Sequence, residues 1–166
     1  MINEDDDDNP SWSSFLIDLD LSIRTTRDSA SGAQGKTGTR AFMAIGALLG
    51  EQHSFIHDLE SFFWVLFWIC VHYDGPERSR VIPEFEQWNY MRMDLLASVK
   101  MGTIADEEIF MKSVETFTAY YQPFIPLINR LREVVFPGGK RYKREDKKLS
   151  FQMREILKEA CNDPGI

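Results

Sequence analysis

The stretch His57-Asp-Leu-Glu-Ser-Phe-Phe-Trp-Val-Leu-Phe-Trp-Ile-Cys-Val-His-Tyr73 decides the fold. From Phe62 to Ile69 every side chain is apolar, so the helix that this stretch predicts has no polar face there. A helix that is apolar on all sides has to be surrounded by protein. The sequence Asp74-Gly-Pro76 follows and ends the helix. We therefore expect the rest of the chain to pack around a central helix over residues 57–73.

Composition and charge exclude several classes of protein. The 166 residues are 43% hydrophobic and 27% charged, which is enough to bury the core of one domain. A net charge of −7 argues against a surface that mainly binds nucleic acid. Two cysteines cannot form a disulfide framework, and the acidic residues 4–8 differ from a secretory signal peptide. The apolar run 62–71 is too short to span a bilayer. We expect an intracellular protein, in the cytoplasm or nucleus, that is not secreted and binds neither nucleic acid nor membrane.

Strands are expected only near the N-terminus. The stretch Phe15–Asp18, apolar up to its terminal aspartate, is typical of a buried strand, and Leu21–Ile23 of a second short one. Residues 24–40 lack hydrophobic periodicity and predict a long loop, a feature that is often functional. After this loop the pattern is helical, with apolar faces on Ala41–Leu49, Phe85/Trp88/Leu95/Val99, Phe110/Val114/Phe117/Tyr121, Leu127/Ile128/Leu131/Val134/Val135 and Leu149/Met153/Ile156/Ala160, and with Thr103 and Asp106 as a capping pair.

Two short motifs suggest other chemistry but lack its context. Residues 30–37, Ala-Ser-Gly-Ala-Gln-Gly-Lys-Thr, are a relaxed form of a phosphate-binding P-loop. Six residues separate them from the preceding strand, and no further parallel strands follow, as a nucleotide-binding sheet requires. The pairs His53/His57 and Cys70/His72 lack the further ligands of a zinc site. We expect these side chains to be ordinary core and surface residues.

Three segments form an ordered set: Leu16-Ile-Asp18-Leu-Asp20, then Gly38-Thr39-Arg-Ala-Phe-Met-Ala44, then His57-Asp58-Leu-Glu-Ser-Phe-Phe63. In this order they resemble the second half of a protein kinase catalytic domain, and their amino-acid sequences are most similar to those of the fungal-type protein kinase family. The segments 97–100, 120–124 and 131–137 support the resemblance. It implies a mainly α fold: a partial protein-kinase-like large (C-terminal) lobe with a short β-hairpin at its N-terminal edge. The resemblance further implies that a single domain, 1–166, divides into a β-element (1–23), an activation segment (24–50) and a helical lobe (51–166).

The resemblance also implies roles for individual residues. Asp18 matches the aspartate that holds Mg²⁺ against the ATP phosphates, and Asp20 is a second candidate metal ligand. Thr39 matches the threonine beside the catalytic base and the substrate pocket. Asp58 matches the aspartate that braces the catalytic loop from the start of the central helix. The family's activity is ATP-dependent phosphorylation of serine and threonine in proteins, with Mg²⁺ and ATP as cofactors and a protein substrate or regulator as partner.

The sequence departs from the kinase pattern in two ways. Ala44-Ile-Gly46 stands where kinases have Ala-Pro-Glu, so the arginine that would pair with this glutamate, Arg130 or Arg132, is expected to be exposed or paired with another acid. The chain also contains no Gly-x-Gly-x-x-Gly loop, ATP-binding lysine strand or catalytic-loop base. We therefore expect no catalytic residue and weak or no nucleotide binding in this chain alone.

Two rival functions remain open. One is a non-catalytic module, a truncated kinase lobe that binds a partner through its amphipathic helices and the basic residues 140–148. The other is a fragment of a small-molecule phosphotransferase of the choline or aminoglycoside type, in which Asp18 and Asp20 would both hold the metal.

Overall fold

The computed structural model describes residues 39–142 and 146–163, all of which belong to one compact unit, Thr37–Ile166. The predicted strands, the β-hairpin and the P-loop-like motif lie outside the described residues, as do Asp18 and Asp20. The described part is mainly helical, as predicted, and within it only an isolated antiparallel bridge joins Tyr73 to Ser79.

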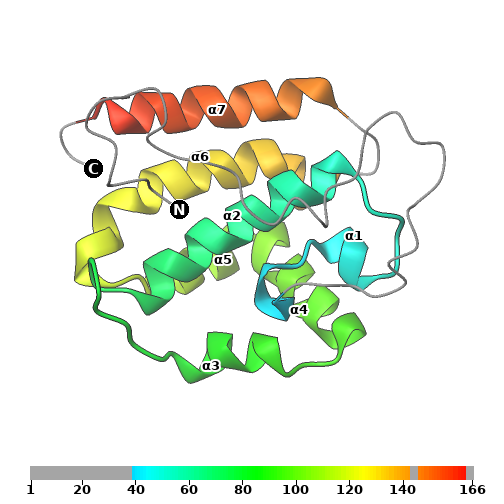
Figure 1. Ribbon diagram of the computed structural model, residues 1–166, viewed down its shortest axis with the longest axis horizontal. Coiled ribbons are helices and arrows are strands. Elements are labelled where there is room, and N and C mark those ends of the chain that lie inside the picture. The colour runs from blue at the N-terminus through cyan, green and yellow to red at the C-terminus, as the bar shows by residue number, and fades with distance from the viewer. Residues whose placement is uncertain (1–38, 143–145, 164–166) are drawn as a thin grey trace, which may run out of the picture. The chain divides into compact units, whose positions relative to one another are not determined.

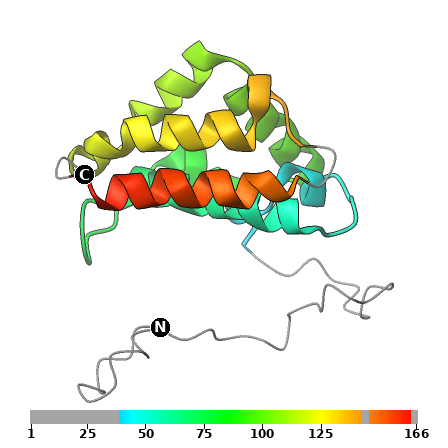
Figure 2. The ribbon, with the colours of Figure 1, turned by 90° about the horizontal axis from the view of Figure 1, so that it is seen from above.

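This unit is built from long helices joined by shorter helical segments (Figure 1). The helices are η3 (Arg40–Phe42), α1 (Ile45–Leu48), α2 (Phe55–His72), α3 (Pro83–Glu86), η4 (Gln87–Asn89), α4 (Met93–Ala105), α5 (Glu107–Val114), η5 (Ala119–Phe124), α6 (Ile125–Val135), η6 (Pro137–Gly139) and α7 (Lys147–Cys161). Helices α6 and α7 lie side by side in both views (Figures 1 and 2), and α2 packs against α6, while α4 contacts α1 and α5.

Helix α2 is the central helix that the apolar stretch predicts, and its ends lie within two residues of the expected ones. At its start, the Ser54 amide donates a hydrogen bond to Nδ1 of His57, at 3.1 Å. At its end, the backbone becomes extended at Tyr73, and Gly75 follows with φ of +90°. One face of α2 carries the aromatic core, in which Phe63, Trp64 and Phe67 are almost fully buried and contact Phe85, Trp88, Phe110, Phe117 and Phe136.

The opposite face of α2 is less covered than its composition predicts. Phe55 is 38% exposed and Phe62 42% exposed, so the described residues do not surround this helix. By length and composition, α2 could also cross a membrane, with a mean hydropathy of 1.3, although the core helix of a soluble protein meets the same two criteria. Half of its residues are buried within the described unit.

Three details of the later helices differ from the sequence prediction. The helix expected across Phe110–Tyr121 ends at Val114, and Tyr121 lies in the separate helix η5. Asp106 caps α5 by itself, because its side chain accepts a hydrogen bond from the Ile109 amide, whereas Thr103 lies inside α4. Leu95 is 52% exposed rather than on the buried face. Hydrophobic spacing located the apolar faces but not the turns that divide them.

The core predicts a sharp contrast between two neighbouring phenylalanines of α2. We expect Phe63→Ala to lower the free energy of unfolding by about 3–5 kcal/mol, because the ring is fully buried and leaves a cavity. Phe62→Ala should lower it by less than about 1 kcal/mol, since that side chain is partly in solvent. Urea denaturation of both variants measures the difference, and equal losses would show that α2 packs through another face.

Candidate functional site

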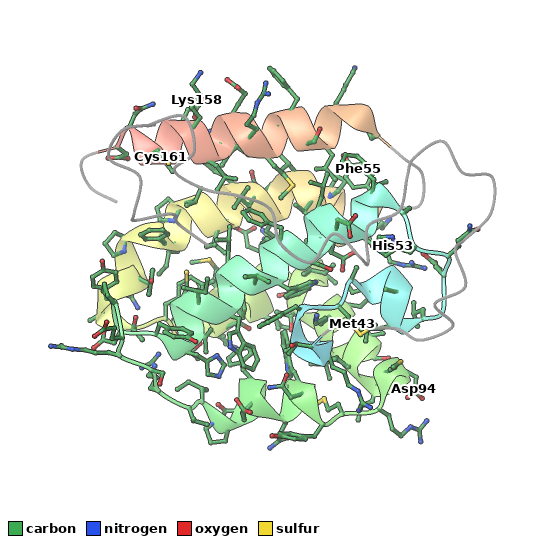
Figure 3. The ribbon with its side chains drawn as sticks, viewed as in Figure 1. Met43, His53, Phe55, Asp94, Lys158 and Cys161 are labelled. Atoms are coloured by element: carbon green, nitrogen blue, oxygen red, sulfur yellow. The ribbon has the colours of Figure 1, made fainter. Side chains whose placement is uncertain are left out.

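The segment from Thr39 to Ile45 is the part of the candidate site that the structure describes. It is short and irregular: one turn of η3 is followed by extended backbone at Met43 and Ala44. Thr39 is exposed, and its carbonyl accepts a hydrogen bond from the Phe42 amide. Ala41 and the residues from Met43 to Ile45 are buried, so the segment has one inner and one outer edge. Figure 3 labels Met43 on this segment.

Lys100, from α4, holds the inner edge of this segment. Its Nζ atom donates hydrogen bonds to the carbonyl oxygens of Ala41, at 2.8 Å, and Met43, at 2.7 Å. The side chain is fully buried, and Nζ lies 4.5 Å from the centre of the Trp64 ring and 5.4 Å from that of Trp88. The two indole faces and two carbonyls provide the negative potential that a buried ammonium group needs.

Glu60, from α2, holds the same segment from its other end. Its Oε1 atom accepts hydrogen bonds from the Ile45 amide, at 2.7 Å, and from Nε1 of Trp64, at 3.1 Å. Burial raises the pKa of this carboxyl group, and the two hydrogen bonds oppose that shift. Burial likewise lowers the pKa of Lys100 to about 7, while the nearby Glu60 charge opposes the change. Trp64 therefore contacts both charged side chains.

Asp58 lies in the first turn of α2 and is exposed. Its Oδ1 atom is 2.9 Å from Nε2 of His53, so within the described residues its recorded partner is a histidine of the preceding loop. Figure 3 shows His53 beside the start of α2. Thr39 and Asp58 are both on the surface, and no direct contact between them is recorded in the described part. Whether Asp58 braces a catalytic loop stays a prediction.

A network that sequence reasoning missed lies between Gly46 and the loop before α7. Glu51 forms an ion pair with Arg141, with 2.6 Å between Oε1 and Nη1, and its Oε2 atom lies 3.6 Å from Nε2 of His57. Because Nδ1 of His57 accepts a hydrogen bond from Ser54, the ring carries its proton on Nε2, which faces Glu51. The hydrogen bond from Arg141 lowers the pKa of the Glu51 carboxyl group.

The two arginines singled out from the sequence behave differently. Arg130 is exposed and pairs with Glu159 at 2.6 Å, so the prediction is confirmed for this residue. The prediction is wrong for Arg132, which is 8% exposed and has no acidic partner among the described side chains. Its guanidinium group instead bonds to the Ile104 carbonyl and the Asn129 side chain, and lies 4.6 Å from the Phe110 ring centre. Carbonyl and aromatic groups thus replace the expected carboxylate.

Side chains that could bind a metal ion are not clustered in the described part of the chain. Over residues 39–142 and 146–163, no group of three or more histidine, cysteine or acidic side chains could hold a metal ion. Cys70 is buried, and burial raises the pKa of its thiol to about 12, which keeps it protonated and unreactive at neutral pH. A metal site at Asp18 and Asp20 stays a prediction, since both lie outside the described residues.

The fold and this site define a helical scaffold that fixes a short irregular segment through buried charges. A family model described as fungal protein kinase matches residues 1–70. This match confirms the resemblance for the part of the chain that contains Asp18, Thr39, Asp58 and most of α2. Comparison with curated proteins and with solved structures gave no significant match.

The signals for Lys100 and Glu60 are visible in the sequence once their positions are known. Lys100 is the charged residue on the buried face of α4, which otherwise comprises Leu96, Ala97, Thr103 and Ile104. Glu60 stands one turn before Trp64 in the most apolar helix of the chain. A charged residue inside such a pattern predicts a buried polar contact, but its partner cannot be found from periodicity alone.

A side chain at position 46 would overlap with His57 and Glu51 unless these two side chains shift. A Cβ atom there would lie 2.3 Å from Nε2 of His57 and 2.5 Å from Oε2 of Glu51. We expect Gly46→Ala to lower the free energy of unfolding by about 1–3 kcal/mol through this overlap. The control is Gly102→Ala in α4, where a Cβ atom meets nothing within 4 Å and should stabilise the helix by about 0.5–1 kcal/mol. Thermal unfolding of both variants measures the two effects, and a neutral Gly46→Ala would contradict the packing.

The depressed pKa of Lys100 predicts a pH dependence of stability. Between pH 7 and 9 the unfolded lysine keeps its proton, whereas folded Lys100 loses it as the pH passes about 7. The unfolded state then binds more protons, so stability rises with pH. We expect the wild type to gain stability relative to Lys100→Met from pH 7 to 9, with a slope of at most about 1.4 kcal/mol per pH unit.

Urea titrations at pH 7, 8 and 9 measure this difference. Lys112→Met is the matched control, because Lys112 is exposed on α5 and pairs only with Glu108 within its own helix. A flat difference between the wild type and Lys100→Met over this range would show that buried Lys100 keeps its proton.

Proposed function

We propose that this chain is the C-terminal part of a protein kinase domain, whose activity is ATP-dependent phosphorylation of serine and threonine in proteins. The observation that carries the proposal is the family match over residues 1–70, which includes the four site residues predicted from the sequence, Asp18, Asp20, Thr39 and Asp58. The helical body that follows, built around the apolar helix α2, agrees with a kinase large lobe. The buried anchoring of residues 41–45 supports a role for this segment in holding a substrate.

In this proposal Asp18 is the ligand for Mg²⁺ bound to ATP, and Asp20 is a second candidate ligand. Carboxylate oxygens are the groups that a hard cation such as Mg²⁺ prefers, and phosphoryl transfer depends on neutralising the phosphate charges. Thr39 would lie beside the acceptor hydroxyl group, and Asp58 would brace the loop that carries the catalytic base. Residues 1–166 contain neither this base nor a glycine-rich phosphate loop, so we propose that they are inactive alone.

The acidic net charge and the two free cysteines support an intracellular kinase that acts on proteins rather than on nucleic acid or at a membrane. The segment after Gly38, Thr39-Arg-Ala-Phe-Met-Ala44, favours a protein substrate over a small molecule, because in protein kinases it builds the peptide pocket.

The first measurement is the intact mass and N-terminal sequence of the protein made by its native cell. We expect a product that extends upstream of Met1, carries a catalytic-loop aspartate and phosphorylates serine or threonine peptides, whereas purified 1–166 transfers no phosphate. In the longer product Asp18→Asn should lower kcat at least about hundredfold, because a metal clamp on the transferred phosphate is lost.

Asp94→Asn is the matched control, since Asp94 is exposed at the start of α4, where Figure 3 labels it. Phosphate transfer by 1–166 would contradict the proposed inactivity, and an unchanged rate in Asp18→Asn would contradict the metal assignment. A native product that starts at Met1 and binds no Mg-ATP would favour the non-catalytic binding module. Transfer to choline or an aminoglycoside, but not to peptides, would favour the small-molecule phosphotransferase.

A further inference from the structure

Three backbone polar groups at alternate positions of one segment are held by charged side chains. The carbonyl groups of residues 41 and 43 accept from Lys100, and the amide of residue 45 donates to Glu60. Lys100 comes from α4 and Glu60 from α2. Helix α4 therefore holds the N-terminal end of the segment 41–45, and α2 holds its C-terminal end. Both residues are buried: Lys100 is completely buried, and Glu60 is 3% exposed.

Burying these two charged side chains costs free energy, and a fixed backbone at residues 41–45 would be a reason to keep them. Burying a lysine and a glutamate removes both from water, and apolar residues of similar size often give equal or better stability. Among the described residues, the carbonyl groups of Ala41 and Met43 have no helix or sheet partner, so they depend on Lys100 for hydrogen bonds. A neutral lysine amine still has two N–H donors, one for each carbonyl, so the contact survives loss of the proton.

Lys100 and Glu60 together form a clamp on residues 41–45. This clamp determines which side chains are exposed on the outer edge of the segment. With Ala41 and residues 43–45 turned inward, Thr39 and Arg40 are exposed and Phe42 is half-buried. Phe42 packs edge-on against Trp68 of α2, and the Arg40 side chain donates to the Met91 carbonyl at 3.0 Å. The outer edge is therefore fixed from both sides, whereas Lys100 and Glu60 themselves cannot reach a ligand.

We propose that Lys100 and Glu60 are positioning residues for the acceptor peptide: by fixing the backbone of residues 41–45, they set the edge formed by Thr39, Arg40 and Phe42. The inference rests on the proposed kinase function, in which this segment contacts the peptide, but its structural half can be tested without any activity.

The structural test is amide hydrogen exchange on the chain 1–166. In Lys100→Met we expect the Ile45 amide to exchange about tenfold to hundredfold faster, because both carbonyl contacts are lost and the segment opens. Amides of α7 should not change, and Lys112→Met, at an exposed lysine, should change neither region. Glu60→Gln keeps an oxygen acceptor for Ile45 and should give a smaller acceleration, so it serves where Lys100→Met does not fold. Unchanged exchange at Ile45 in both variants would overturn the clamp.

The functional test uses the longer, active kinase. We expect Lys100→Met to raise KM for a serine or threonine peptide at least about tenfold and to leave KM for ATP unchanged, because the phosphate-binding groups lie elsewhere. A general loss of structure would instead impair both substrates, and Glu60→Gln should show the same pattern more weakly. Faster exchange at Ile45 with an unchanged peptide KM would overturn the positioning role, whereas a wild type without phosphate transfer would overturn the proposed function and leave the exchange result standing.

Discussion

The arrangement of the candidate site depends on the contacts that the buried indole ring of Trp64 makes. It belongs to the aromatic core, where it packs against Phe63 and Trp88, and it also touches both charged side chains of the clamp. Its ring face lies under the Lys100 ammonium group, while its N–H group donates to Glu60. A large aromatic residue in a close-packed core has little freedom to move. Trp64 therefore restricts the positions of the Lys100 and Glu60 side chains.

The same solution for a buried cation occurs twice in the described unit. Lys100 and Arg132 both lie against an aromatic ring and donate to main-chain carbonyls, and neither has a recorded ion pair among the residues described. Carbonyl oxygens do not titrate, so these contacts persist where a carboxylate would be protonated. A buried acid, Glu60, lies near Lys100 and favours its protonated form, but the two side chains form no direct ion pair among the residues described.

Local patterns predicted much of the fold, and long-range contacts were beyond them. The apolar stretch predicted α2 to within two residues, and the ordered motifs led to the family that matches residues 1–70. Apolar spacing could not predict that the helix after Asp106 ends at Val114. Apolar residues of the turn that follows are buried in the core just as those of the helix are, so their spacing does not mark where the helix ends. Lys100 lies 59 residues from Ala41, so no local pattern connects them.

The glycine at position 46 shows how a missing motif residue can mislead. The sequence alone indicates a lost glutamate, and with it a lost tie between the activation segment and the late helices. In the structure a Cβ atom at this position would overlap with the side chains of His57 and Glu51, and Glu51, five residues later, pairs with Arg141 in the loop before α7. An acid from just after the segment thus still reaches an arginine near the late helices. The missing glutamate at position 46 therefore does not mean that this part of the chain lacks an acid paired with an arginine near the late helices.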